Sequence, residues 1–152
     1  MLTAEPEGWW RRRYRLFDEE GRDLGVVELN WGWGKAGQIT VEARLLEIER
    51  HRWTGPWVVS ADGDRIATVT KLRVFSRSFE IDFDGENYLM QPRLLSSIFD
   101  VFVEGRAVGT LRSAGLFSRR IVVDLPDDMP LALRAIATWV VIMVRKRANA
   151  AS

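Results

Sequence analysis

The sequence has no cysteine and a single histidine, His51, among its 152 residues. Without cysteine the chain cannot form a disulfide, a thiolate metal site, a thiol nucleophile or a palmitoyl anchor. One histidine excludes metal sites built from several histidines. No partner for a general base is visible beside His51, so we expect it to be solvated. The chain also lacks a large net charge, because 22 basic residues balance 21 acidic ones. That balance argues against nucleic acid as a partner.

The N-terminal residues do not resemble a secretory signal. Glu5, Pro6 and Glu7 follow a start with no basic residue and no apolar run, unlike a secretory signal. We therefore expect a cytoplasmic location, with peripheral attachment to a membrane as the open alternative. Apolar residues make up 47% of the chain and charged residues 28%, the balance of a globular protein, and the length predicts one domain over residues 1–152.

Alternating apolar and polar residues mark several candidate strands. Apolar side chains recur at every second position in residues 39–45, 46–49, 79–83 and 99–104, and at all such positions except Arg12 in residues 10–16. The phase slips between Leu45 and Leu46, where we expect a bulge or a break. Glycines after an acidic residue, at positions 21, 63, 85 and 105, indicate turns. Many short strands with regular turns predict an antiparallel sandwich or barrel.

A repeat of 42 residues organises these strands. Gly21, Gly63 and Gly105 lie 42 residues apart, and residues 63–83 match residues 105–125 at six of 21 positions. Each copy carries an aromatic residue, a small residue and a cation in one turn, as Trp33-Gly34-Lys35, Phe75-Ser76-Arg77 and Phe117-Ser118-Arg119. Three copies are too few for a propeller, which needs about four to eight blades. If each repeat holds an even number of strands, these turns lie at one end of a meandering barrel.

The last third of the chain contains one apolar segment, LALRAIATWVVIMV, at residues 131–144. A helix that is apolar on every face belongs in a core or in lipid. This segment would reach about 21 Å, the height of a small barrel, whereas a bilayer core is about 30 Å thick. Residues suited to the two helix ends flank it, namely Asp127, Asp128, Pro130, Arg145, Lys146 and Arg147. We predict a strand-rich shell around a buried C-terminal helix, with a membrane tail anchor as the alternative.

The order of short strands, the motif Pro-Asp-Asp-Met-Pro at residues 126–130 and a wholly apolar final helix resembles the tubby C-terminal-like superfamily. This group includes the tubby proteins, the phospholipid scramblases and the LURP-one-related proteins. Residues 120–147 are most similar to the scramblase and LURP-one-related ends, and the two Phe-Ser-Arg turns fit their strand pairs. The resemblance implies a mainly β fold, an antiparallel closed barrel of about twelve strands around a central helix.

The resemblance also implies ligands. Tubby domains bind phosphoinositides through basic residues, and scramblases bind calcium in the acidic stretch before the helix. The matching candidates for calcium are Asp124, Asp127 and Asp128, whose other interpretation is helix capping. No other cofactor is expected. Scramblases rely on palmitoylated cysteines, which this chain lacks, so lipid scrambling is not expected.

Candidate anion ligands follow the repeated turns. They are Lys35, Arg77, Arg119 and Arg120, which would form a cationic rim at one barrel end, where arginine binds phosphate through paired hydrogen bonds. The alternative is that these cations are solvated or pair with Asp82 and Asp124.

A second basic group lies near the N-terminus. It comprises Arg11, Arg12, Arg13 and Arg15 beside Trp9 and Trp10. This group fits either a lipid interface or an edge strand protected by charge.

Three functional classes remain open. The first is a non-catalytic binding module for anionic ligands such as phospholipid headgroups. The second is a structural or protein-interaction domain without a small ligand. The third is an enzyme, which the single histidine and the missing Gly-x-Ser-x-Gly motif argue against. We rank them in that order.

Overall fold

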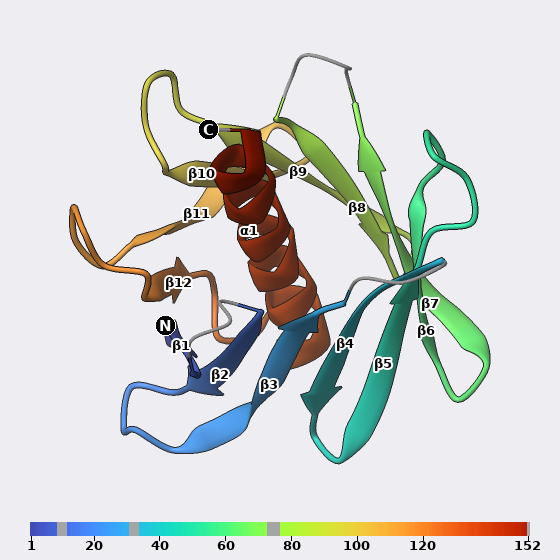
Figure 1. Cartoon of the computed structure of the whole chain (residues 1–152), viewed down its shortest axis with the longest axis horizontal. Coiled ribbons are helices and arrows are strands. Elements are labelled where there is room, and N and C mark those ends of the chain that lie inside the picture. Colours follow the sequence, from blue (N-terminus) through green and yellow to red (C-terminus); the bar gives the residue numbers. More distant parts are fainter. Residues whose placement is uncertain (9–11, 31–33, 73–76, 152) are drawn as a thin grey trace.

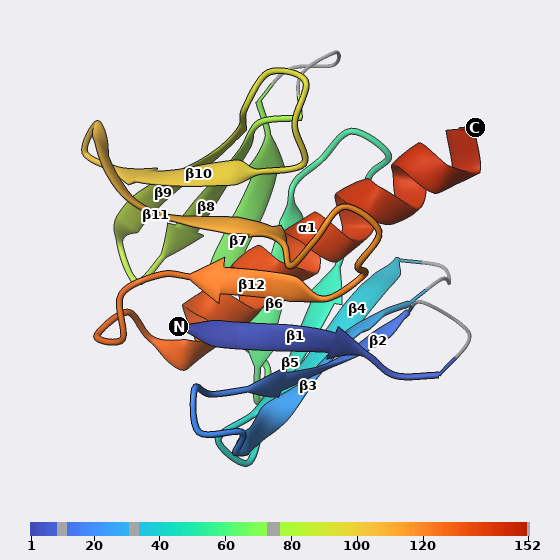
Figure 2. The same ribbon diagram turned by 90° about the vertical axis from the view of Figure 1, so that its left-hand side faces the viewer.

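The alternation in the sequence becomes twelve antiparallel strands that wrap around one helix (Figures 1 and 2). The computed structural model describes residues 1–8, 12–30, 34–72 and 77–151, with side chains to residue 148. The strands are β1 (Leu2–Pro6), β2 (Arg13–Phe17), β3 (Asp23–Leu29), β4 (Lys35–Val41), β5 (Arg44–Glu49), β6 (Trp57–Ala61), β7 (Asp64–Lys71), β8 (Phe79–Phe83), β9 (Glu86–Pro92), β10 (Phe99–Val103), β11 (Arg106–Ser113) and β12 (Ile121–Asp124), and the helix is α1 (Leu131–Ala151).

The sheet closes because β1 pairs with β12, with Leu2 opposite Val123, while every other strand pairs with its neighbours in the chain. The predicted twelve-stranded barrel is thus confirmed. β2 lies between β1 and β3. The interpretation of the N-terminal arginines as part of an edge strand is therefore wrong for Arg13 and Arg15. Within β2, apolar side chains face the core and the alternating polar ones face solvent.

Tight hairpins join the strands at one end of the barrel. The predicted turns at Asp62-Gly63, Asp84-Gly85 and Glu104-Gly105 are confirmed, each with two positive φ angles between 50° and 83°. One turn was missed. Glu42 and Ala43 also have positive φ, 51° and 58°, and separate β4 from β5. The expected break between Leu45 and Leu46 is wrong, and no glycine or asparagine marked the true turn.

The first two copies of the repeat contain four strands each, β3 to β6 and β7 to β10, and the third contains β11, β12 and the helix. The number of strands in each copy is even, so equivalent turns share an end, as predicted for that case. We call one end the exit end. It comprises the described residues 7–8, 12, 30, 34, 50–56, 72, 77–78, 93–98 and 114–120 of the connecting loops, with the helix residues from 145 onward. The other, the start end, comprises the turns at 18–22, 42–43, 62–63, 84–85 and 104–105 and the segment 125–130. Trp33, Phe75 and Ser76 lie outside the described residues.

The helix α1 forms the centre of the core. It begins at Leu131, where the Arg134 N–H donates to the Pro130 carbonyl at 3.1 Å. Leu133, Ile136, Trp139, Val140 and Met143 are all buried. In the described part of the chain, no helix is long and apolar enough to cross a membrane. The prediction of a core helix enclosed by the sheet is confirmed.

The helix is longer than predicted. It continues past Val144 to Ala151, and its last turns emerge beyond the strands (Figure 2). Arg145, Lys146 and Arg147 were expected to mark its end and instead lie within it. The extension has a local reason, because the residues after Val144 include arginine, lysine and alanine, which favour helix, and no glycine or proline.

The indole of Trp139 fixes where the helix lies in the barrel. Its Nε1–H donates to the Ala36 carbonyl at 3.3 Å. Gly37 leaves space for the ring, since a Cβ there would come within 2.3 Å of Nε1. The helix accordingly packs mainly against β3 and β4 and makes fewer contacts with β9, β10 and β11. Room is left on the far side of the helix.

Gly37→Ala is expected to lower the free energy of unfolding by about 1–3 kcal/mol, because the added methyl would also meet the Glu28 carbonyl at 2.7 Å. Urea denaturation measures this change. Gly115→Ala is the matched control, since the nearest atom to a Cβ there is 3.9 Å away. Equal stability of both variants would contradict the close approach of Trp139 to β4.

Candidate functional site

The barrel is filled at its start end, where Leu125 and Met129 are buried, and hollowed at its exit end. A cavity of about 630 Å³ lies between α1, residues of β2, β9, β10 and β11, and the loops at 93–98 and 114–120. We call it the main pocket. Its lining includes five cations and four serines and no acidic residue: Arg12, Arg77, Arg119, Arg145, Lys146, Ser96, Ser97, Ser113 and Ser118. The position of the helix against β3 and β4 leaves this side open.

Arg145 is the most enclosed cation of the main pocket. Its Nη2 donates to Ser113 Oγ at 2.6 Å and its Nη1 donates to the Arg119 carbonyl at 3.0 Å. Burial lowers the pKa of Arg145, and its interaction with Tyr14 opposes that effect. Among the described residues no carboxylate pairs with this guanidinium. The pocket therefore holds a partly desolvated positive charge without a negative partner.

The other cations add to this charge. Arg77 comes from the β7–β8 loop and Arg119 from the β11–β12 loop, and neither forms an ion pair with a described residue. Burial lowers the pKa of Lys146, and repulsion from Arg12 lowers it further. Like charges held this close favour an anion between them.

The serines supply neutral donors. Ser96 Oγ accepts the Ile98 N–H at 3.0 Å, and Ser118 Oγ accepts the Arg120 N–H at 3.1 Å. These turns position both side chains and leave each hydroxyl hydrogen available to donate. Proteins bind phosphate with such groups, namely arginine guanidiniums that donate paired hydrogen bonds and hydroxyl donors between them.

A second cavity, of about 540 Å³, lies on the other flank of the helix. Arg50 and Arg147 lie over the ring of Trp57, with Cζ at 4.0 Å and 5.3 Å from its centroid. Burial lowers the pKa of Arg50, and Arg147 lowers it further. Lys35 also lines this cavity, and no lining residue is acidic.

The four predicted anion ligands are thus divided. Arg77 and Arg119 come together in the main pocket, whereas Lys35 lines the second cavity. Arg120 Nη2 forms an ion pair with Glu5 at 3.0 Å and is not part of either lining.

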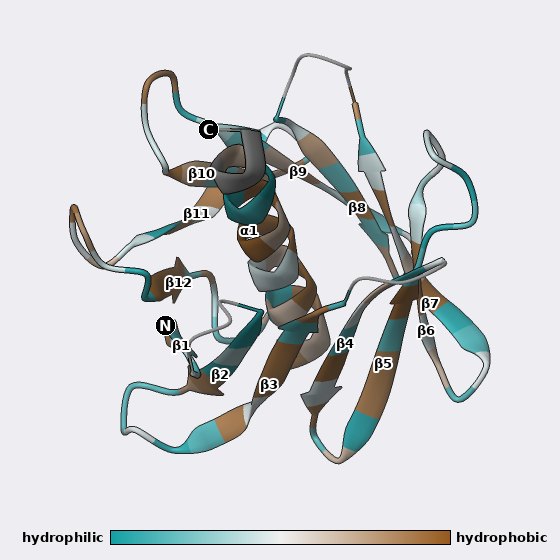
Figure 3. Ribbon diagram, in the orientation of Figure 1, coloured by the Kyte–Doolittle hydropathy of each residue, from teal (hydrophilic) through white to brown (hydrophobic). Residues whose placement is uncertain are grey.

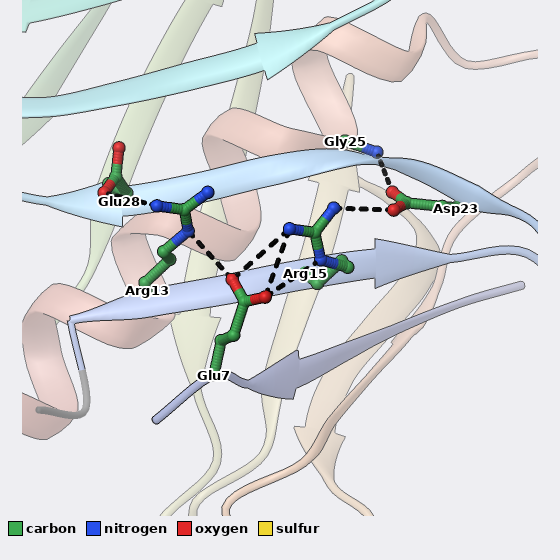
Figure 4. A network of polar contacts seen from close by, with 6 residues as sticks. All are labelled: Glu7, Arg13, Arg15, Asp23, Gly25 and Glu28. Atoms are coloured by element: carbon green, nitrogen blue, oxygen red, sulfur yellow. Dashed lines mark hydrogen bonds and ion pairs between the residues drawn. The ribbon is translucent and has the colours of Figure 1, made fainter. Parts of the chain in front are cut away.

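The N-terminal basic group is divided as well. Arg13 and Arg15 join an ion-pair network on the outer wall (Figure 4). Glu7 lies 2.8 Å from Arg13 and 3.1 Å from Arg15, and Arg15 also pairs with Asp23 at 2.6 Å. Arg12 lines the main pocket. Trp9, Trp10 and Arg11 lie outside the described residues.

The predicted calcium ligands lie at the start end. Asp127 accepts a hydrogen bond from the Met1 ammonium at 3.0 Å, which lowers the Asp127 pKa. Asp124 ends β12, and Asp128 precedes the helix. Within the described residues no three acidic or histidine side chains are grouped to hold a metal. Calcium binding stays a prediction.

His51 is exposed, with Nε2 3.5 Å from Glu49. Sequence reasoning missed several pocket residues, above all Arg145, Lys146, Ser96 and Ser97. The two cations were explained by the helix dipole. The serines follow Leu94 and Leu95, and a pair of leucines inside a turn segment was a signal that could have drawn attention to this loop.

In comparisons with known proteins, no family model, no curated protein and no solved structure matched the chain. The resemblance to the tubby C-terminal-like superfamily therefore stays a prediction, and the function is argued from the site.

Proposed function

We propose that the chain is a non-catalytic binding module for phosphate-bearing anionic ligands, foremost phospholipid headgroups, and that the main pocket is the site. The observation that carries this proposal is Arg145, a partly buried guanidinium bound to a carbonyl and a hydroxyl but to no carboxylate of the described residues. A phosphate between Arg145, Arg77 and Arg119 would neutralise it and gain charge-assisted hydrogen bonds.

Binding should raise the melting temperature, because the pocket exists only in the folded state. We expect inositol trisphosphate and glycerol 3-phosphate to raise it, whereas inositol and glycerol leave it unchanged. A thermal-shift assay compares each phosphate with its neutral parent. No rise with any phosphate compound would contradict the proposal.

The double variant Arg77→Gln with Arg119→Gln is expected to weaken phosphate binding about 100-fold, since each lost charged hydrogen bond is worth about 1.5–3 kcal/mol. Titration calorimetry gives the affinities. The matched control is Arg44→Gln with Arg65→Gln, which removes two exposed arginines near the start end. If both double variants bind the phosphates equally well, the main pocket is not the site.

A further inference from the structure

The exit end presents bulky apolar side chains to solvent. Leu94 is 91% exposed, Leu95 100%, Leu116 97% and Phe117 99%. Trp53, at 93%, lies in the β5–β6 loop at the same end. Exposed apolar groups gathered on one face mark an interaction surface, whereas isolated ones are ordinary.

Four of these side chains form two prongs beside the main pocket. Leu94 and Leu95 stand on the loop 93–98, and Leu116 and Phe117 stand on the loop 114–120. The loops are neighbours because β10 pairs with β11. Both loops also line the pocket, through Ser96, Ser97, Ser118 and Arg119. Figure 3 shows hydrophobic colour at the two loop tips.

The two ends of the barrel differ in the sign of their charged residues. The described part of the exit end contains many cations: Arg12, Arg50, Arg52, Arg77, Arg93, Arg119, Arg120, Arg145, Lys146 and Arg147. Its one acidic residue among those described, Glu7, is already paired with Arg13 and Arg15. The start-end turns are mostly acidic: Asp18, Glu19, Glu20, Glu42, Asp62, Asp84, Glu104, Asp127 and Asp128. This asymmetry would turn the exit end toward a negative surface.

We propose that the exit end docks onto an anionic phospholipid bilayer, with the two prongs inserted at the boundary between headgroups and acyl chains. Cations behind the tips then lie at the level of the lipid phosphates, and the main pocket opens onto them. A bilayer fits better than a folded partner, because a fluid surface accepts separate apolar tips and supplies phosphates between them. Occupation of the pocket rests on the proposed function, whereas insertion rests on the prongs alone.

The first test is sedimentation with phosphatidylcholine vesicles that contain or lack phosphatidylserine. We expect the protein to bind the anionic vesicles, more weakly at high salt, and to leave the neutral ones largely unbound. The prong variant carries Leu94→Ser, Leu95→Ser, Leu116→Ser and Phe117→Ser. Its affinity for the anionic vesicles should be lower by a factor of about 100 or more. Leu45→Ser is the control, because Leu45 is 47% exposed near the start end.

The second test measures insertion directly. Since the chain has no cysteine, Leu95→Cys and Leu45→Cys each carry a single environment-sensitive dye. On anionic vesicles the dye at position 95 should shift to shorter wavelength and be quenched by nitroxide-labelled lipids. The dye at position 45 should report an aqueous environment both in the free protein and in the presence of anionic vesicles.

The two tests separate this proposal from the proposed function. Prong variants should keep the thermal shift with soluble inositol trisphosphate, whereas Arg77→Gln with Arg119→Gln should lose it and still insert the dye at position 95. Docking through the prongs is overturned if the prong variant sediments like the original chain, if the dye at position 95 stays in water, or if neutral and anionic vesicles bind equally. It is likewise overturned if no vesicle binds and only a protein partner does.

Discussion

Trp139→Ala is expected to lower the free energy of unfolding by about 3–5 kcal/mol, the largest stability loss of any single substitution considered. Trp139 is fully buried at the centre of the barrel. Its ring lies edge-on to Trp57 at 5.9 Å, and its Nε1–H donates to the Ala36 carbonyl. Alanine would leave a cavity inside the sheet and remove the group that holds the helix against β4. Urea denaturation followed by circular dichroism measures the change.

Trp53→Ala is the matched control for this prediction. Trp53 is 93% exposed, so its removal should change the free energy of unfolding by no more than about 0.5 kcal/mol. Similar losses for the two tryptophans would contradict enclosure of the helix by the barrel.

Arg145→Met is expected to separate binding from stability. Methionine keeps much of the apolar stem and removes the partly buried charge, so the ligand-free protein should be as stable as the original or more stable. Ser113 Oγ and the Arg119 carbonyl, which Arg145 now satisfies, face a cavity that water can enter. Affinity for glycerol 3-phosphate should fall about 10- to 100-fold, as expected when charged hydrogen bonds are lost.

Denaturation and calorimetry on the same preparation test both halves of that prediction. Arg106→Met serves as the control, because Arg106 is exposed at the start of β11, far from the pocket. A marked loss of stability in Arg145→Met would make Arg145 a structural group. Unchanged phosphate affinity would remove it from the site.

Local patterns in the sequence were sufficient to predict a strand-rich shell around a buried helix, whereas the closed barrel of about twelve strands was predicted from the resemblance. Residues 79–83 alternate in the sequence and form β8 over the same positions. The 42-residue period predicted that the repeated turns share one end if each repeat holds an even number of strands. The apolar length of residues 131–144 distinguished a core helix from a membrane span. The Glu42-Ala43 turn was missed because its chemistry is not typical of a two-residue hairpin turn.

The site was predictable only in part. Arg77 and Arg119 were found because the repeat gives them equivalent positions. Arg145 was not, because its place in a pocket depends on the helix lying to one side of the barrel. That displacement results from Trp139 packing against Gly37, two residues far apart in the sequence. Contacts between distant residues leave no local pattern from which a pocket could be predicted.

Hydrogen–deuterium exchange of the free and vesicle-bound protein tests the central claim, that the exit end is the binding face. With anionic vesicles we predict slower exchange in residues 93–98 and 114–120 and unchanged exchange in the turns at 62–63, 84–85 and 104–105. Slower exchange in those start-end turns instead, or no change in the loops that carry the prongs, would contradict the account.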